Sequence, residues 1–142
     1  MSGTNEAPAI LSAAVSRALR QAAAHPSVRD VVVTGQIEDW ILASVTIHTE
    51  LPALWRAARE SPFGVRIDEE VTIGLRKDFP LSAPWIALRK DFPRFHPHIQ
   101  PDKPDSAVRP CLVNGSPREV VQARGFIGLV EQLVEWLARR TV

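Results

Sequence analysis

The sequence predicts an α+β domain in which an N-terminal helix, a four-stranded antiparallel meander, an irregular loop and a C-terminal helix follow one another. Apolar residues recur at helical spacing near both ends of the chain, and four short strand-like segments lie between them. A proline-rich stretch then precedes the last helix. No internal repeat or low-complexity tract interrupts this order, so we expect a single domain spanning residues 1–142.

Apolar residues spaced three and four apart indicate the first helix. They are Ile10, Leu11, Ala14, Val15, Ala18, Leu19 and Ala22. Pro8 suits the start of this helix, and His25-Pro26 is expected to stop it. Arg17 and Arg20 fall on the opposite face, where charged side chains are normally solvated. A docking surface for a partner is the alternative interpretation of these two arginines.

Alternating and β-branched patterns predict four strands, at residues 31–33, 40–48, 71–75 and 85–88. Residues 35–39 are expected to form the turn between the first two strands. A short helix is predicted at residues 51–61, with Pro52 in its first turn. The two prolines within residues 78–84 require that segment to leave the sheet as a turn.

The last helix is predicted to be structural, because it carries a continuous apolar stripe. The stripe consists of Phe126, Leu129, Val130, Leu133, Val134 and Leu137. Gly125 is the expected start of the helix. Arg139 and Arg140 lie at its C-terminal end, where positive charge complements the helix dipole.

Composition excludes several classes of function. Lysine and arginine number 17 and aspartate and glutamate 16, and the basic residues are scattered, so nucleic-acid binding through a broad basic surface is not indicated. No apolar run approaches ~20 residues, and no basic-then-apolar leader begins the chain, so no membrane partner is expected. A single cysteine forms no internal disulfide, which favours a reducing, cytoplasmic location.

That single cysteine, Cys111, is the main candidate for chemistry. It follows the run His96-Pro97-His98-Ile99 by a short loop and lies in Arg109-Pro110-Cys111-Leu112. A thiolate is a good nucleophile and imidazole titrates near neutral pH, so this combination suits acyl or thioester chemistry. The alternative interpretation is a buried cysteine that packs as a small hydrophobe.

Three short motifs in order resemble those of the ubiquitin-conjugating enzyme (UBC fold) family. They are Phe79-Pro80-x-x-Ala83-Pro84, His96-Pro97-His98-Ile99 and Pro110-Cys111-Leu112. The resemblance covers roughly residues 9–137 and is closest to the divergent bacterial branch of ubiquitin-like conjugation and antiphage operons. It implies a UBC-like fold with an active-site loop, and a transferase that carries a ubiquitin-like modifier as a thioester on Cys111 and passes it to an amine of a target protein.

The same resemblance implies the other participants and their sites. The expected partners are the ubiquitin-like modifier, an activating enzyme (separate or fused) and the target protein, and no cofactor or metal is expected. Arg17 and Arg20 would help to dock the activating enzyme. His96, Pro97 and Pro110 would support the loop rather than react.

The chain departs from the family pattern at the active-site loop. His98 occupies the family's asparagine position, and a histidine there can donate a hydrogen bond to the oxyanion, act as a base or support the loop. The loop between His98 and Cys111 is longer than usual, and its Asp102 and Asp105 are candidates to orient the acceptor amine or are simply solvated. Many relatives continue with further C-terminal helices, so the chain is either a minimal member or a domain of a longer protein.

Three other functions compete with conjugation. An inactive UBC- or RWD-like binding module would share the fold, although inactive members typically lack the cysteine. A cysteine hydrolase would use Cys111 with His98 or His96, but hydrolases usually place the nucleophile at a helix N-terminus. A metal site built from the same three side chains is disfavoured, because Pro97 separates the histidines and no fourth ligand is evident.

Overall fold

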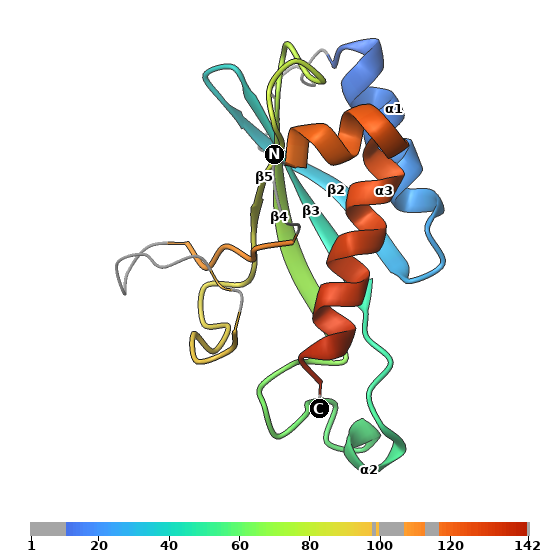
Figure 1. Cartoon of the computed structure of the whole chain (residues 1–142), viewed down its shortest axis with the longest axis vertical. Coiled ribbons are helices and arrows are strands. Elements are labelled where there is room, and N and C mark those ends of the chain that lie inside the picture. The colour runs from blue at the N-terminus through green and yellow to red at the C-terminus, as the bar shows by residue number, and fades with distance from the viewer. Residues whose placement is uncertain (1–10, 98, 100–106, 113–116, 142) are drawn as a thin grey trace, which may run out of the picture.

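The computed structural model describes residues 11–97, 99, 107–112 and 117–141. The α+β class is confirmed, with an N-terminal helix, a four-stranded antiparallel sheet and a C-terminal helix. The elements are α1 (Ala13–Ala24), β2 (Val28–Ile37), β3 (Trp40–His48), α2 (Ala53–Arg56), β4 (Asp68–Arg76), β5 (Trp85–Ala87) and α3 (Pro117–Arg139). The strand order β2-β3-β4-β5 makes a simple meander, and α1 and α3 lie together beside it (Figure 1).

Helix α1 begins later than predicted. The Ser12 hydroxyl accepts a hydrogen bond from the Val15 amide at 3.1 Å, so Ser12 is the N-cap, and Pro8, the expected start, lies outside the described residues. The predicted stop is confirmed, since the helix ends at Ala24 and His25 is extended. The expected apolar face is buried through Val15, Ala18, Leu19 and Ala22. Arg17 and Arg20 are exposed on the other face.

The predicted strand at residues 40–48 has the observed bounds of β3, and its side chains alternate between buried and partly exposed. The first strand, in contrast, was predicted too short. β2 pairs with β3 from Val28↔Ile47 to Ile37↔Trp40, because backbone hydrogen bonding to a neighbour does not require apolar side chains on an edge strand. Only residues 38–39 form the turn, so the predicted turn at residues 35–39 is wrong.

The predicted helix at residues 51–61 is mostly wrong, because α2 is a single turn of four residues. Leu51 is buried, but Leu54 is 76% exposed, so the apolar spacing does not make a buried face. Without a surface to cover, one turn of helix gains little from packing. The chain then bends through Arg59, which has φ 60°, toward β4.

Strands β4 and β5 pair through Thr72↔Ala87, Ile73↔Ile86 and Gly74↔Trp85. The predicted turn between them is confirmed; it contains a cis peptide bond between Phe79 and Pro80. β5 ends at Ala87 instead of the predicted residue 88.

The helical segment that carries the predicted stripe begins directly after Gly125, as expected, but α3 as a whole begins earlier, at Pro117. Gly125 has φ 75° and ψ 177°, which divides the helix into two segments that meet at a sharp angle (Figure 1). This backbone conformation is open to glycine and almost closed to other residues. The shorter segment before Gly125 buries Val121, and the longer one carries the predicted stripe.

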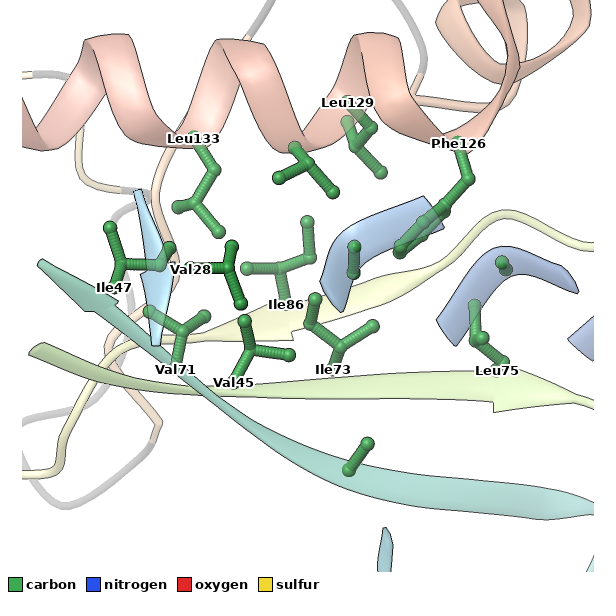
Figure 2. Close-up of a cluster of buried hydrophobic side chains, with 14 of the residues drawn as sticks. Val28, Val45, Ile47, Val71, Ile73, Leu75, Ile86, Phe126, Leu129 and Leu133 are labelled. Carbon is green, nitrogen blue, oxygen red and sulfur yellow. The ribbon is translucent and has the colours of Figure 1, made fainter. Parts of the chain in front are cut away.

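The core lies between the longer segment of α3 and the sheet. Figure 2 shows Phe126, Leu129 and Leu133 pointing from α3 toward Val45 and Ile73 of the strands. Phe126 also meets the ring of Phe79 edge-on, with centroids 5.9 Å apart. Burying each such side chain contributes roughly 1.5–3 kcal/mol, so α3 is held mainly by this face. No helix in the described ranges is long and apolar enough to span a membrane.

Candidate functional site

Cys111 is exposed at the end of a firmly attached segment, so the alternative of a buried cysteine is wrong. Val108, three residues earlier, is completely buried, and its carbonyl oxygen accepts a hydrogen bond from the Leu88 amide at 2.7 Å. Pro110 is buried and forms an isolated antiparallel bridge with Ile99. The backbone immediately before the thiol is therefore attached at two points, while the thiol itself faces solvent.

Arg109 lies between these two attachment points. Its guanidinium carbon is 5.6 Å from the centroid of the Trp85 ring, a distance at which cation and ring attract each other. The Arg109 Nε atom is buried and has no hydrogen-bond partner among the residues described. The stacking fixes the direction of the Arg109 side chain against β5, two residues before Cys111.

His96 is buried, with 8% of its surface exposed, and its ring is sandwiched by aromatic neighbours. The Phe95 ring stacks on it at a centroid distance of 4.6 Å, and the Phe92 ring lies 5.2 Å away. His96 Nε2 lies 2.7 Å from the Phe63 carbonyl oxygen, so Nε2 must carry the proton that it donates. Burial lowers the pKa of His96, although the Phe63 hydrogen bond acts in the opposite direction. A neutral His96 thus joins its own loop to the loop that precedes β4.

The structure brings two of the sequence motifs side by side. Ile99 follows His96 by three residues and pairs with Pro110, which precedes Cys111. Pro97 is exposed, so the attachment of this loop comes from the His96 imidazole and from Ile99. His98, Asp102 and Asp105, the other predicted site residues, lie outside the described residues.

Sequence reasoning missed a buried ion pair close to this loop. Glu69 is fully buried, and its Oε1 accepts a hydrogen bond from Arg89 Nε at 2.9 Å. Its Oε2 accepts a hydrogen bond from the Arg66 backbone amide at 2.7 Å. Burial raises the pKa of the Glu69 carboxyl, and the bonds from Arg89 and Arg66 offset part of that rise. The signal was in the alternation of β4, because Glu69 occupies the same inward register as Val71 and Ile73.

We found no metal-binding constellation in residues 11–97, 99, 107–112 and 117–141: no three histidine, cysteine or acidic side chains there converge on one point. The described part of the site therefore consists of an exposed thiol on an anchored segment, and the loop that pairs with this segment through Ile99 is held by a neutral histidine and lies close to a buried ion pair.

The N-terminal helix, four-stranded antiparallel meander and C-terminal helix are consistent with the fold of conjugating-enzyme-like proteins of the E2 type. The chain belongs to prokaryotic E2 family A, whose family model matches residues 15–140. Neither a curated protein nor a solved structure matches it. The family match supports a conjugating-enzyme-like transferase role in general, and with it interaction with a modifier and an activating enzyme.

Proposed function

We propose that the protein carries a ubiquitin-like modifier as a thioester on Cys111 and transfers it to an amine of a target protein. The setting that we propose is the cytoplasm of a bacterium, in a conjugation or antiphage defence system. The observation that supports this function best is the exposure of Cys111 at the end of a segment attached through Val108 and Pro110. A nucleophile needs both access and a fixed direction, and this segment supplies both.

Two acyl transfers make up the proposed reaction. In the first, the Cys111 thiolate attacks the carbonyl carbon of the thioester between the modifier and the activating enzyme, whose own sulfur leaves as a thiolate. In the second, an uncharged amine attacks the Cys111 thioester, a carbon–nitrogen bond forms, and the Cys111 sulfur leaves. The proton that the amine loses passes to a base, and the oxyanion formed on the way needs a hydrogen-bond donor.

His98 is the proposed base or oxyanion donor of the second transfer. Asp102 and Asp105 are proposed to orient the acceptor amine. His96 and Pro110 are proposed as supporting residues, in keeping with the Phe63 hydrogen bond of the first and the Ile99 pairing of the second.

Arg17 and Arg20 are proposed to help dock the activating enzyme. Both are exposed on the face of α1 that points away from the core. Neither forms an ion pair within the described ranges, so both guanidinium groups remain open to carboxylates of a partner.

A loading assay tests the function. The chain is incubated with ATP, a genetically linked ubiquitin-like modifier and its activating enzyme, and the products are separated with and without reducing agent. We expect a reducible adduct on the wild type, a more persistent ester on Cys111→Ser and no adduct on Cys111→Ala. An adduct that persists in Cys111→Ala would overturn the assignment.

The same assay separates conjugation from the competing functions. A cysteine hydrolase would release the free modifier without accumulating an adduct, and a binding module would form no covalent product. Cys111 does not occupy the N-terminus of α3, which begins at Pro117, so the structure does not offer it the helix dipole that many thiol hydrolases use.

A further inference from the structure

Arg89 joins two segments that are far apart in the sequence. Its guanidinium donates to both Glu69 carboxylate oxygens, with Nε at 2.9 Å and Nη2 at 3.3 Å. Nη2 also donates to the Gly64 carbonyl oxygen, and Nη1 donates to Asp91 at 3.1 Å. Only 12% of the Arg89 side chain and none of the Glu69 side chain is exposed. Arg89 therefore fastens the chain after β5 to the loop that precedes β4.

The Gly64 carbonyl that Arg89 binds is adjacent in sequence to the Phe63 carbonyl that His96 binds. The side chains of Arg89 and His96 thus donate hydrogen bonds to the carbonyl oxygens of two successive residues, Gly64 and Phe63. The approach is close, because a Cβ atom at Gly64 would collide with the Pro93 ring. The Arg89 guanidinium also lies 5.3 Å from the Phe92 ring centroid, and the Phe92 ring contacts that of His96. Arg89 and His96 are therefore parts of one connected arrangement.

This arrangement bears directly on the Cys111 segment. The chain leaves the sheet after β5, and two described residues of this stretch hold the Cys111 segment: the Leu88 amide donates to the Val108 carbonyl oxygen, and Ile99 pairs with Pro110. Arg89 follows the first of these attachment points, and His96 precedes the second. The course of this stretch therefore bears on where Ile99 lies relative to Pro110 and the thiol that follows it.

We propose that Arg89, held by Glu69, is a positioning residue of the conjugation site, which sets the placement of His96 and Ile99 and, through the pairing of Ile99 with Pro110, of the backbone before Cys111. This inference rests on the proposed function. Arg89 acts through His96 and the loop, and touches no reacting group. A misplacement of about 1 Å in a site can slow the chemical step by roughly 100-fold, so the transfer to the amine should depend on Arg89 far more than loading does.

Variants can separate positioning from stability. Arg89→Met alone leaves the Glu69 carboxylate buried without its partner, and the protein is expected to lose stability. The double variant Glu69→Leu/Arg89→Met replaces the pair by apolar side chains of similar size, a change that is often neutral or stabilising. It also removes the hydrogen bond to Gly64. Arg66→Met is the matched control, because Arg66 is 48% exposed and its side chain forms only exposed ion pairs.

The test compares the full-length wild type, the control and the double variant. Pre-formed thioester is mixed with increasing amine, and the discharge rate at saturating amine is separated from the half-saturating amine concentration. In the double variant we expect wild-type melting temperature and loading, an unchanged half-saturating concentration and a discharge rate lower by about 10- to 100-fold. Arg66→Met should match the wild type. A double variant that discharges at the wild-type rate would overturn the proposal.

A second readout needs no modifier. The His96 Nε2 proton, bound to the Phe63 oxygen, should give a slowly exchanging NMR signal in the wild type that shifts or disappears in the double variant. Wild-type protein that never loads would count against the proposed function alone. An unchanged His96 signal in a stable double variant would count against the positioning role, whatever the loading assay shows.

Discussion

His96 and Phe63, 33 residues apart in the sequence, are joined by a 2.7 Å hydrogen bond from imidazole Nε2 to the carbonyl oxygen. The bond needs a proton on Nε2 only, and a second proton on Nδ1 would place a charge in a buried position. Arg140, whose positive charge also lowers the pKa of His96, would oppose that charge. Burial and Arg140 therefore favour the neutral ring, whereas the Phe63 hydrogen bond favours the protonated one.

A pH dependence of stability follows from the burial of His96. Because burial lowers the pKa of His96 in the folded state, the unfolded chain, with an ordinary value of about 6.5, binds its proton first as the pH falls. The free energy of unfolding should therefore decrease below about pH 6.5, until the folded protein is protonated as well. His96→Gln keeps an N–H donor and does not titrate, so its decrease should be shallower. Urea unfolding between about pH 7 and pH 5 measures both, and parallel curves would contradict the prediction.

Leu133 and Leu54 offer the same substitution in opposite surroundings. Leu133 is 1% exposed on the buried face of α3, and Leu54 is 76% exposed on α2. Leu133→Ala should lower the free energy of unfolding by roughly 2–5 kcal/mol through lost contacts and a residual cavity. Leu54→Ala should change it by no more than about 0.5 kcal/mol. Chemical denaturation measures both, and equal effects would show that the core is misassigned.

Alanine substitutions at Gly125 and Gly35 measure the cost of backbone strain, because neither position has a steric clash and only one has a positive φ. A Cβ atom would meet nothing within 4 Å at either position, but only Gly125 has a positive φ. Gly125→Ala should therefore destabilise the protein by about 1–3 kcal/mol through strain alone. Gly35→Ala should stay within about 1 kcal/mol of the wild type. Thermal or urea unfolding of the two variants decides, and a neutral Gly125→Ala would argue against the break in α3.

Reversal of the two arginines on α1 tests their proposed role in docking. Arg17→Glu/Arg20→Glu should slow thioester loading without lowering the melting temperature, because both side chains are exposed. Arg29→Glu/Lys77→Glu changes the net charge equally, on exposed residues of β2 and of the turn after β4, and should load normally. Equal loading rates in the two double variants would show that Arg17 and Arg20 are solvated residues with no part in docking.

His98 is predicted to act after loading, during transfer to the amine. His98→Ala should load normally and discharge to an amine about 10²–10³-fold more slowly, the usual contribution of a general base or an oxyanion donor. His98→Asn distinguishes the two, since asparagine keeps a donor but is no base near neutral pH. Discharge retained in His98→Asn favours oxyanion or loop support, and discharge lost in both variants favours proton transfer. Normal discharge in both would make His98 an ordinary loop residue.

The sequence alone was sufficient where a structural feature depends on near neighbours. The alternation from Trp40 to His48 predicted β3 with its bounds, and the apolar spacing after Gly125 predicted the buried face of α3. Both patterns arise because one face of the strand or helix is buried against the core, and the spacing of apolar residues along the chain records that face.

Tertiary structure decided whatever depends on partners distant in the sequence. β2 extends to Ile37 because β3 pairs with it, and α2 stops after one turn because Leu54 has no surface to cover. Glu69 is tolerated inside because Arg89, twenty residues later, supplies the opposite charge and two hydrogen bonds, and because the Arg66 amide supplies a third. An unpaired charge at such a position is too costly to bury, and its partner appears only once the strands and loops have come together.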